Sequence, residues 1–277
     1  MAIEIRPVKT QDEYTAVEQL QREIWGASDI EIVAFETLMT AHKNGGVVLG
    51  AFDEEKLVGF VFGFIGLTPD GELKHCSHIA GVLESYRDRN VGYALKLRQR
   101  QQVLAQGIEL INWTFDPLES RNARFNFHKL GVTCSAYLRN WYGEMRDKLN
   151  AGLPSDRLQV DWRIASPRVE QRLRGESKNP LVSDLLAAGV PLINQPVEDR
   201  LLCPPEKTLR VEGERLLIQI PADFQSLKAA DRDLALGWRL HTRALFEEAF
   251  ATGYTVTDLL VERGRSFYYL DSDSTVG

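Results

Sequence analysis

Apolar and polar residues follow two different periods along the chain. Segments with a period near two predict β-strands, and segments with apolar residues three and four positions apart predict helices. In the first 132 residues these patterns predict the order βααβββαβα. The strands are expected at 3–8, 47–66 (a hairpin around an acidic turn), 73–82 and 108–115, and the helices at about 10–25, 34–46, 87–105 and 120–131.

The remaining residues are predicted to add a second α/β region. After a strand-like segment at 157–164, a polar stretch carrying Pro167, Gly175, Asn179 and Pro180 is the best candidate for a linker. Beyond it the pattern predicts a strand at 214–221, a helix at 231–250, and strands at 254–261 and 266–271. We therefore expect one domain over 1–166 and a C-terminal region over 167–277.

Composition limits the function classes. The chain has 277 residues, of which 44% are hydrophobic and 26% charged, and it lacks an apolar run near the roughly 20 residues of a membrane span. A net charge of −6 and a pI near 5.5 argue against a nucleic-acid-binding surface. The first ten residues do not have the pattern of a signal peptide, so a cytoplasmic location is expected. The three scattered cysteines form neither a disulfide framework nor a metal-ligand pattern.

The segment "YRDRNVGYALK" at 86–96 joins a predicted strand to a predicted helix. The first amides of a helix have no partners within it and lie at the positive end of its dipole, so they can bind an anion. Gly92 permits close approach of a ligand to the backbone, and Arg87 and Arg89 add positive charge. The segment matches neither the P-loop nor the dinucleotide-binding glycine pattern.

In its context this segment resembles the acetyl-CoA-binding motif of the GNAT superfamily of N-acyltransferases. Arg87, Gly92 and Ala94 fit that motif, whereas Asn90 stands at its first glycine. The segment "SRNARFNFHKLGV" at 120–132 is similar to the family's next motif, with Phe127 at the position of the usual tyrosine. The stretches "SHIAGV", "WTFDPL" and "NARFNFHKLG" look like a subgroup of predicted GNAT acyltransferases with an extra C-terminal region. The resemblance covers about residues 3–165.

The resemblance implies an α/β fold with a mixed, splayed sheet flanked by helices, and acetyl-CoA or another acyl-CoA as co-substrate. The pantetheine arm would lie along the backbone of the strand at 79–82, and the pyrophosphate on the amides of 87–92. Asn90 is a mild departure if its backbone needs a positive φ, which asparagine tolerates better than any residue except glycine. The expected cofactor-binding residues are Ile79, Ala80, Val82, Arg87, Asn90, Val91, Gly92, Tyr93, Asn122 and Asn126. Asn122 and Asn126 lie four residues apart and therefore on one helix face, which could face the cofactor. In the alternative interpretation, Asn122 caps the helix and Asn126 is solvated.

Two residues are candidates for the chemistry. Strand alternation is expected to place His78 on one face with Cys76, Ala80 and Val82, and a histidine there could remove the proton of an amine; a hydrogen-bonded core histidine is the alternative. Asp116, at the end of the next strand, could orient His78 or hold the amine, or instead form an Asx turn before proline. No metal site is expected.

The family's usual acid for the departing thiolate is absent, because the phenyl ring of Phe127 cannot donate a proton. Tyr137 and Tyr142 are nearby hydroxyls in the sequence. The other groups have plainer interpretations. Cys76 and Cys134 are expected to be small buried residues, and solvated helix faces are expected for two sets of basic residues: Lys96, Arg98 and Arg100, and Arg239 and Arg243.

The sequence therefore predicts a cytoplasmic, CoA-dependent N-acyltransferase that transfers an acetyl group, or another acyl group such as succinyl, to a small primary amine such as an amino acid. A non-catalytic acyl-CoA-binding or assembly module is the alternative. The expected partners are a small-molecule amine and acyl-CoA, with neither nucleic acid nor membrane. The C-terminal region could enclose the acceptor site or form a homo-oligomer interface.

Overall fold

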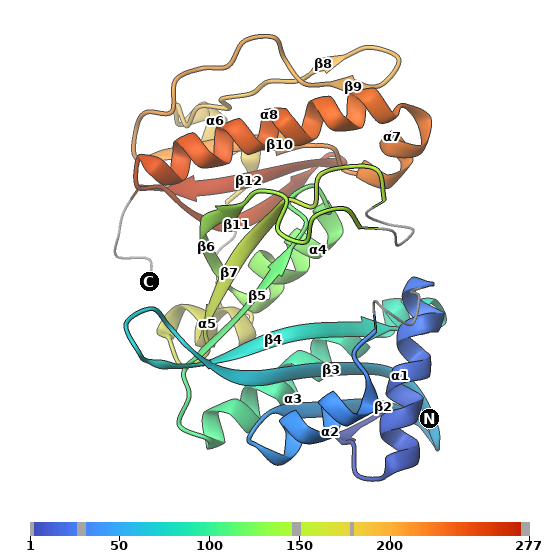
Figure 1. The fold of residues 1–277 in the computed structure, drawn as a ribbon. Helices are drawn as coiled ribbons and strands as arrows, with labels where there is room; N and C mark the ends of the chain where they lie inside the picture. Colours follow the sequence, from blue (N-terminus) through green and yellow to red (C-terminus); the bar gives the residue numbers. More distant parts are fainter. Residues whose placement is uncertain (1–2, 27–31, 146–150, 178–179, 273–277) are drawn as a thin grey trace. The chain divides into compact units, whose positions relative to one another are not determined.

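The computed structural model describes residues 3–26, 32–145, 151–177 and 180–272. Their contacts divide the chain into two compact units (Figure 1). Unit 1 contains residues 1–113 and 146–151, and unit 2 contains residues 114–145 and 152–277. This division does not coincide with the predicted boundary at residue 166, because the polypeptide passes from one unit to the other within a strand.

Unit 1 contains the strands and helices that the sequence predicts for its first 115 residues, in the predicted order, and also a short 3₁₀ helix that the sequence does not predict, so the helix expected from residue 87 begins at Val91. They are β1 (Glu4–Pro7), α1 (Gln11–Trp25), α2 (Phe35–Lys43), β2 (Val47–Asp53), β3 (Lys56–Leu67), β4 (Leu73–Val82), the 3₁₀ helix η1 (Glu84–Arg89), α3 (Val91–Ala105) and β5 (Leu110–Phe115), whose last two residues belong to unit 2. Thr10 caps α1 through a capping box with Glu13, which confirms the first predicted helix start.

The strands of unit 1 follow the order β1-β2-β3-β4-β5. The first three pairings are antiparallel, and β4 pairs with β5 in parallel, so the predicted mixed sheet is confirmed. Helices cover both of its faces. A Cβ atom built on Gly81 would meet α1, and one built on Gly59, whose neighbour Phe60 pairs with Gly81, would approach Leu95 of α3. Neighbouring strand residues point to opposite faces, so α1 and α3 lie on opposite sides.

Unit 2 begins with the end of β5. Its further elements are α4 (Ser120–Arg124), the π-helix η2 (Phe125–Leu130), β6 (Thr133–Leu138), β7 (Arg157–Arg163), α5 (Pro167–Leu173), α6 (Val182–Ala187), β8 (Val197–Glu198), β9 (Leu202–Cys203), β10 (Arg215–Ile220), α7 (Phe224–Ala230), α8 (Arg232–Ala251), β11 (Thr255–Glu262) and β12 (Arg265–Asp271). The predicted linker is wrong in part, because its first residues form α5 within this unit; Asn179 lies outside the described residues.

The main sheet of unit 2 has the order β7-β6-β11-β12-β10, with antiparallel neighbours, and β8 and β9 form a separate pair. The long helix α8 lies along the sheet in Figure 1. Phe246 of α8 packs edge-on against Tyr268 of β12, while the neighbouring Phe267 belongs to a cluster with Val182 and Leu185 of α6. The two helices therefore cover opposite faces of β12. None of the described helices is long and apolar enough to cross a membrane.

Candidate acyl-CoA site

The edge of β4 becomes free of its parallel neighbour after a short distance. In the described part of the chain the register of β4 and β5 contains two pairs, His75 with Ile111 and Cys76 with Asn112. On its other edge, β4 stays paired with β3 as far as Val82. Residues 77–82 therefore present backbone groups on the side from which β5 has separated. Such groups need partners, and an extended ligand can supply them.

A β-bulge lies at the start of this free edge. Phe62 of β3 pairs with Ile79, whereas the next residue, Gly63, pairs with Ser77, so His78 is the additional residue of β4. The imidazole ring of His78 lies 5.9 Å from the ring centroids of both Phe62 and Phe64. Although the side chain is exposed, this crowding removes solvent from one side and lowers the pKa of His78 below its ordinary value.

The bulge corrects the predicted alternation on β4. Directly opposite residues of an antiparallel pair lie on the same face of the sheet. Ala80 pairs with Val61, on the face that α3 covers, whereas His78 lies with Phe62 on the opposite face. The expectation that His78 shares a face with Ala80 and Val82 is therefore wrong, because the additional residue reverses the alternation beyond it.

Helix α3 begins after the turn that follows β4, and no side chain caps its first turn. Asn90 has φ 58° and ψ 17°, in the left-handed region, which agrees with the predicted reason for an asparagine there. The side chain of Asn90 makes no capping bond to α3. The first amides of the helix, from Val91 to Tyr93, have no partners further back in the helix, so an anion can accept their hydrogen bonds.

Gly92 is not required by the fold of unit 1 itself. Its backbone φ is not positive, and a Cβ atom built on it would meet one atom, Val82 Cγ2, at an ordinary contact distance of 3.9 Å. A glycine in a helix destabilises it relative to alanine. Neither the backbone conformation nor the packing therefore demands a glycine at this position.

The other predicted cofactor-binding residues fall into two groups. Arg87 is exposed in η1, and its Nε donates to the carbonyl of Val82 at 3.4 Å. Asn122 and Asn126 belong to unit 2, where they lie on one helix face, as predicted, with Asn126 Nδ2 3.4 Å from Asn122 Oδ1. The alternative, in which Asn122 caps the helix and Asn126 is solvated, is wrong, because Glu119 is the N-cap residue and Asn126 is buried.

Phe127 is part of the core of unit 2. It is fully buried, with Phe115 and Tyr268 against its ring at centroid distances of 6.0 and 5.8 Å. The position of the family's usual acid is therefore filled by packing. The Tyr137 hydroxyl donates to Asp156, and burial strongly raises the pKa of Tyr137, which makes it a poor acid near neutral pH. The exposed Tyr142 hydroxyl lies 2.9 Å from Thr114 Oγ1 on β5.

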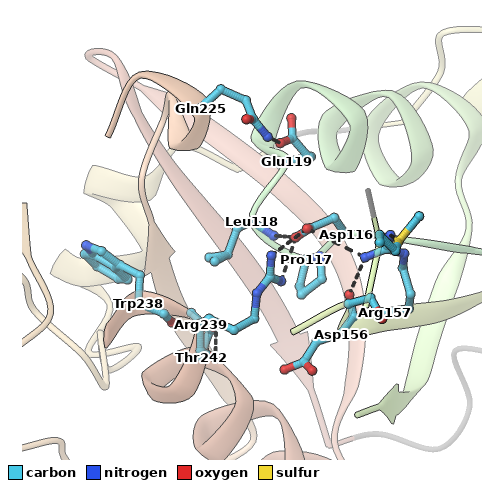
Figure 2. A network of polar contacts seen from close by, with 12 residues as sticks. Asp116, Pro117, Leu118, Glu119, Asp156, Arg157, Gln225, Trp238, Arg239 and Thr242 are labelled. Atoms are coloured by element: carbon cyan, nitrogen blue, oxygen red, sulfur yellow. Dashed lines mark hydrogen bonds and ion pairs between the residues drawn. The ribbon is translucent and has the colours of Figure 1, made fainter. Parts of the chain in front are cut away.

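Asp116 is held within unit 2 by a buried arginine (Figure 2). Arg239, which is 2% exposed, donates to both carboxylate oxygens, at 2.7 and 2.5 Å. The amide of Leu118 donates to Asp116 Oδ1 at 2.9 Å, which is the predicted Asx turn, and Arg157 lies 3.7 Å from Oδ2. The solvated face predicted for Arg239 is wrong, and the contacts of Asp116 assign it to the framework of unit 2.

Arg243 also points into unit 2. It donates two hydrogen bonds to Asp156, both at 2.8 Å, and Asp156 also accepts bonds from Tyr137 and the Asn140 amide. Burial alone raises the pKa of Asp156, but the bond from Arg243 and these further bonds outweigh it and lower the pKa. The expected solvated face is therefore wrong for Arg243 as well.

Lys96 is the largest departure from expectation in unit 1. It was predicted to lie on a solvated helix face, yet it is 5% exposed. Its Nζ lies 2.7 Å from Ser77 Oγ, 3.2 Å from Gln99 Oε1 and 3.7 Å above the ring of Trp113. No ion pair joins a carboxylate to Lys96 among the described residues. Burial lowers the pKa of Lys96 to about 7.

The polar cluster around Lys96 also includes His75. Its Nε2 lies 3.1 Å from Gln99 Nε2, and its ring fills the space above Gly63, where a Cβ atom would come within 2.3 Å of it. Burial, and then the charge of Lys96, lower the pKa of His75 to about 4. The sequence held one signal for this cluster: Gln99 lies in a row of otherwise apolar positions of α3 at four-residue spacing, with Val91 and Leu95 before it and Val103 after it, and Lys96 directly follows Leu95.

Comparisons with known proteins found similar solved structures only. No family model and no curated protein matches the sequence. Among the solved structures that match, a GNAT-family protein from Desulfovibrio desulfuricans is 18% identical over 59% of this chain and 100% of its own, with a TM-score of 0.47. The ribosomal-protein-S18-alanine N-acetyltransferase from Escherichia coli is 12% identical over 60% and 96%, with a TM-score of 0.46.

A third match is Naa50 from Arabidopsis thaliana, solved with the bisubstrate analogue CoA-Ac-MVNAL. It is 15% identical over 58% of this chain and 98% of its own, with a TM-score of 0.44. Identities below 25% and TM-scores below 0.5 leave the residues of this chain as the basis for assigning a function. No group of three or more metal-binding side chains is present among the described residues.

The buried lysine predicts a pH-dependent stability. Lys96 has its ordinary pKa of 10.5 when unfolded and about 7 when folded, so between these values the unfolded chain binds more protons. The free energy of unfolding should therefore rise with pH from about 7 to 10.5, by up to about 1.4 kcal/mol per pH unit, and lose this dependence below pH 7. Urea unfolding at several pH values should show this rise for the wild type relative to Lys96→Met. Arg98→Met, on the exposed side of α3, should keep the rise with pH. If the free energies of unfolding of the wild type and Lys96→Met differ by the same amount at every pH, Lys96 does not have the lowered pKa.

The ion pair of unit 2 predicts a large loss of stability on breaking it. Asp116→Asn removes the counter-charge of buried Arg239 and should lower the free energy of unfolding by about 3–5 kcal/mol. Glu198→Gln breaks the exposed pair with Arg265 in the same unit and should cost less than about 1 kcal/mol. Chemical denaturation followed by circular dichroism measures both. Equal, small effects would show that Asp116 is not part of the framework.

Proposed function

We propose that this chain is a CoA-dependent N-acyltransferase of the GNAT type, which transfers an acetyl or another acyl group from acyl-CoA to a small primary amine such as an amino acid. The observation that carries the proposal is the free edge of β4, which η1 connects to the start of α3, where no side chain caps the helix. The free edge of β4 can bind an extended arm that contains amides, and the start of α3 can bind an anion. CoA contains these two parts in the same order, the pantetheine arm and then the pyrophosphate.

The residues of unit 1 divide the binding between them. Backbone groups of 79–82 would pair with the pantetheine arm as a neighbouring strand does. The amides of Val91, Gly92 and Tyr93 would hold the pyrophosphate, and exposed Arg87 would add positive charge. Asn90 sets the left-handed turn that aims these amides. Asn122 and Asn126 stay predicted contacts of the cofactor, supported by their common helix face.

His78 is the residue that we assign to proton transfer. The amine nitrogen attacks the thioester carbonyl, a C–N bond forms, the C–S bond breaks, and the amine loses a proton while the thiolate gains one. The lowered pKa of His78 keeps its imidazole neutral at neutral pH, so it can accept the proton of the amine. Asp116 was the second predicted catalytic residue, and we give it no step because Arg239 binds both of its oxygens.

The source of the proton for the thiolate separates this proposal from its alternative. Buried Phe127 cannot donate a proton, and this favours a non-catalytic acyl-CoA-binding module. A thiolate, whose ordinary pKa is near 8.5, needs protonation less than an alkoxide does, so water is a sufficient donor for catalysis. Release of CoA thiol in the presence of an amine therefore distinguishes an enzyme from a binding module.

His78→Ala should slow the reaction without weakening acyl-CoA binding. Loss of a general base should lower kcat about 100-fold or more, while the Kd of acyl-CoA stays within about threefold of the wild type. Thiol release from acetyl-CoA and succinyl-CoA with a panel of amines measures the rate, and calorimetry measures Kd. In the wild type, kcat/KM should fall in acid, at a pH below the pKa of an ordinary histidine because the pKa of His78 is lowered, since protonated His78 cannot accept a proton.

Added imidazole should restore part of the activity of His78→Ala, since it replaces the missing base. An unchanged rate, or the same acidic limb of the pH profile in wild type and variant, would remove His78 from the mechanism. Binding of acyl-CoA without thiol release for any amine would favour the binding module, and failure of acyl-CoAs to bind would exclude both functions.

Gly92→Ala should separate stability from binding. Alanine fits the backbone at Gly92 and should raise the free energy of unfolding by about 0.4–1 kcal/mol. Its methyl group would also occupy the position where the pyrophosphate approaches the amides, so the Kd of acyl-CoA should rise about tenfold or more. Thermal denaturation and calorimetry measure the two effects.

Gly237→Ala is the matched control, because Gly237 lies in helix α8 of unit 2 with open space beside it. It should stabilise the protein to a similar extent and leave acyl-CoA binding unchanged. If Gly92→Ala also leaves binding unchanged, the pyrophosphate does not lie on the start of α3.

A further inference from the structure

The separation of β4 and β5 has a defined origin in unit 1. Cys76 and Asn112 form the last pair between the two strands. The next residue of β4 is Ser77, and the next residue of β5 is Trp113. These two residues are therefore the first on each strand beyond the shared register, at the point where the strands part.

Lys96 of α3 contacts both of these residues. Its ammonium group donates to Ser77 Oγ at 2.7 Å and lies 3.7 Å from the centre of the Trp113 ring. Gln99, one turn further along α3, accepts from Lys96 at 3.2 Å and from Ser77 Oγ at 3.2 Å, so the helix, the ammonium group and β4 form one closed set of bonds. A cation over the face of an indole ring is attracted by its π electrons, most strongly where solvent is excluded.

The surroundings of Lys96 make its position energetically demanding. A buried cation is costly unless polar groups surround it, and the Lys96 ammonium group contacts a hydroxyl, an amide oxygen and an indole ring. The titratable neighbour on β4 is His75, which burial and the charge of Lys96 keep neutral. An apolar residue at position 96 would avoid this cost, so the contacts to Ser77 and Trp113 are the evident reason for a lysine.

We infer that Lys96 is a positioning residue that fixes the point where β4 and β5 separate and so holds open the edge of β4. This inference rests on the proposed function in one respect, since the edge of 77–82 is where acyl-CoA is proposed to bind. At Val82 this edge continues toward the start of α3, where the pyrophosphate is proposed to bind. At its other end, Ser77 and Trp113, the edge is closed by the pairing of β4 with β5. Lys96 therefore determines where the slot for the acyl-pantetheine arm ends.

Lys96→Met tests the inference, because methionine keeps an unbranched side chain and removes the ammonium group. The Kd of acyl-CoA should rise about tenfold or more, with a matching rise in KM and a smaller change in kcat. In the free protein, amide hydrogen exchange at 77–82 and 111–113 should become at least about tenfold faster relative to the amides of β2, which serve as the internal reference. Arg98→Met removes an exposed charge from the same helix and should change neither quantity.

The two measurements keep this inference apart from the proposed function. If the wild type binds no acyl-CoA, the proposed function fails, and hydrogen exchange still decides whether Lys96 positions the strands. A folded Lys96→Met variant with unchanged local exchange overturns the inference, and so does a uniform increase in exchange throughout unit 1. If Lys96→Met does not fold, Ser77→Ala replaces it: the same changes, smaller in size, support the inference, and their absence overturns it.

Discussion

The early end of the pairing between β4 and β5 is the constraint on which the proposed site depends. Every backbone N–H and C=O group of a sheet needs a partner, and the register of β4 with β5 among the described residues has two pairs, at 75–76 and 111–112, so β5 supplies no further ladder partners to residues 77–82. The bulge at His78 falls at the start of this free edge, and the left-handed turn at Asn90 follows its end. The bulge and the turn therefore lie at opposite ends of the segment of β4 at 77–82, with which β5 does not pair.

The two units bury positive charge in different ways. In unit 2, Arg239 and Arg243 each form a two-point pair with an aspartate, which is the arrangement that makes a buried guanidinium tolerable. In unit 1, the Lys96 ammonium group contacts a hydroxyl, an amide oxygen and an indole ring. The first arrangement stabilises a framework. The second leaves a group whose charge changes near neutral pH, at the point where two strands part.

Phe127 shows why the motif by itself does not decide the chemistry. Its ring packs between Phe115 and Tyr268, so the position is used for the core of unit 2. The proposed catalysis then depends on His78, whose environment is set by the bulge and by two phenylalanines of β3. Acyl transfer to an amine is compatible with this set because a thiolate leaves without a strong acid.

Local patterns in the sequence determined the order and nature of the elements. The order of strands and helices in the first 131 residues follows from periodicity, which acts over a few positions. At position 90 the sequence determined only that an asparagine would tolerate a positive φ, and the structure shows that this φ is adopted. The Asx turn at Asp116 follows in the same way.

The tertiary structure alone decided which side chains are buried and which strands stay paired. The faces of Ala80 and Val82 depend on one additional residue in β4, which periodicity does not reveal. Lys96, Arg239 and Arg243 read as exposed helix residues, because long charged side chains on a helix usually reach water. Apart from Gln99, which lies one turn from Lys96 on the same helix, their partners are distant in the sequence. The separation is 19 positions between Lys96 and Ser77 and 123 positions between Arg239 and Asp116, so only the folded chain brings these residues together.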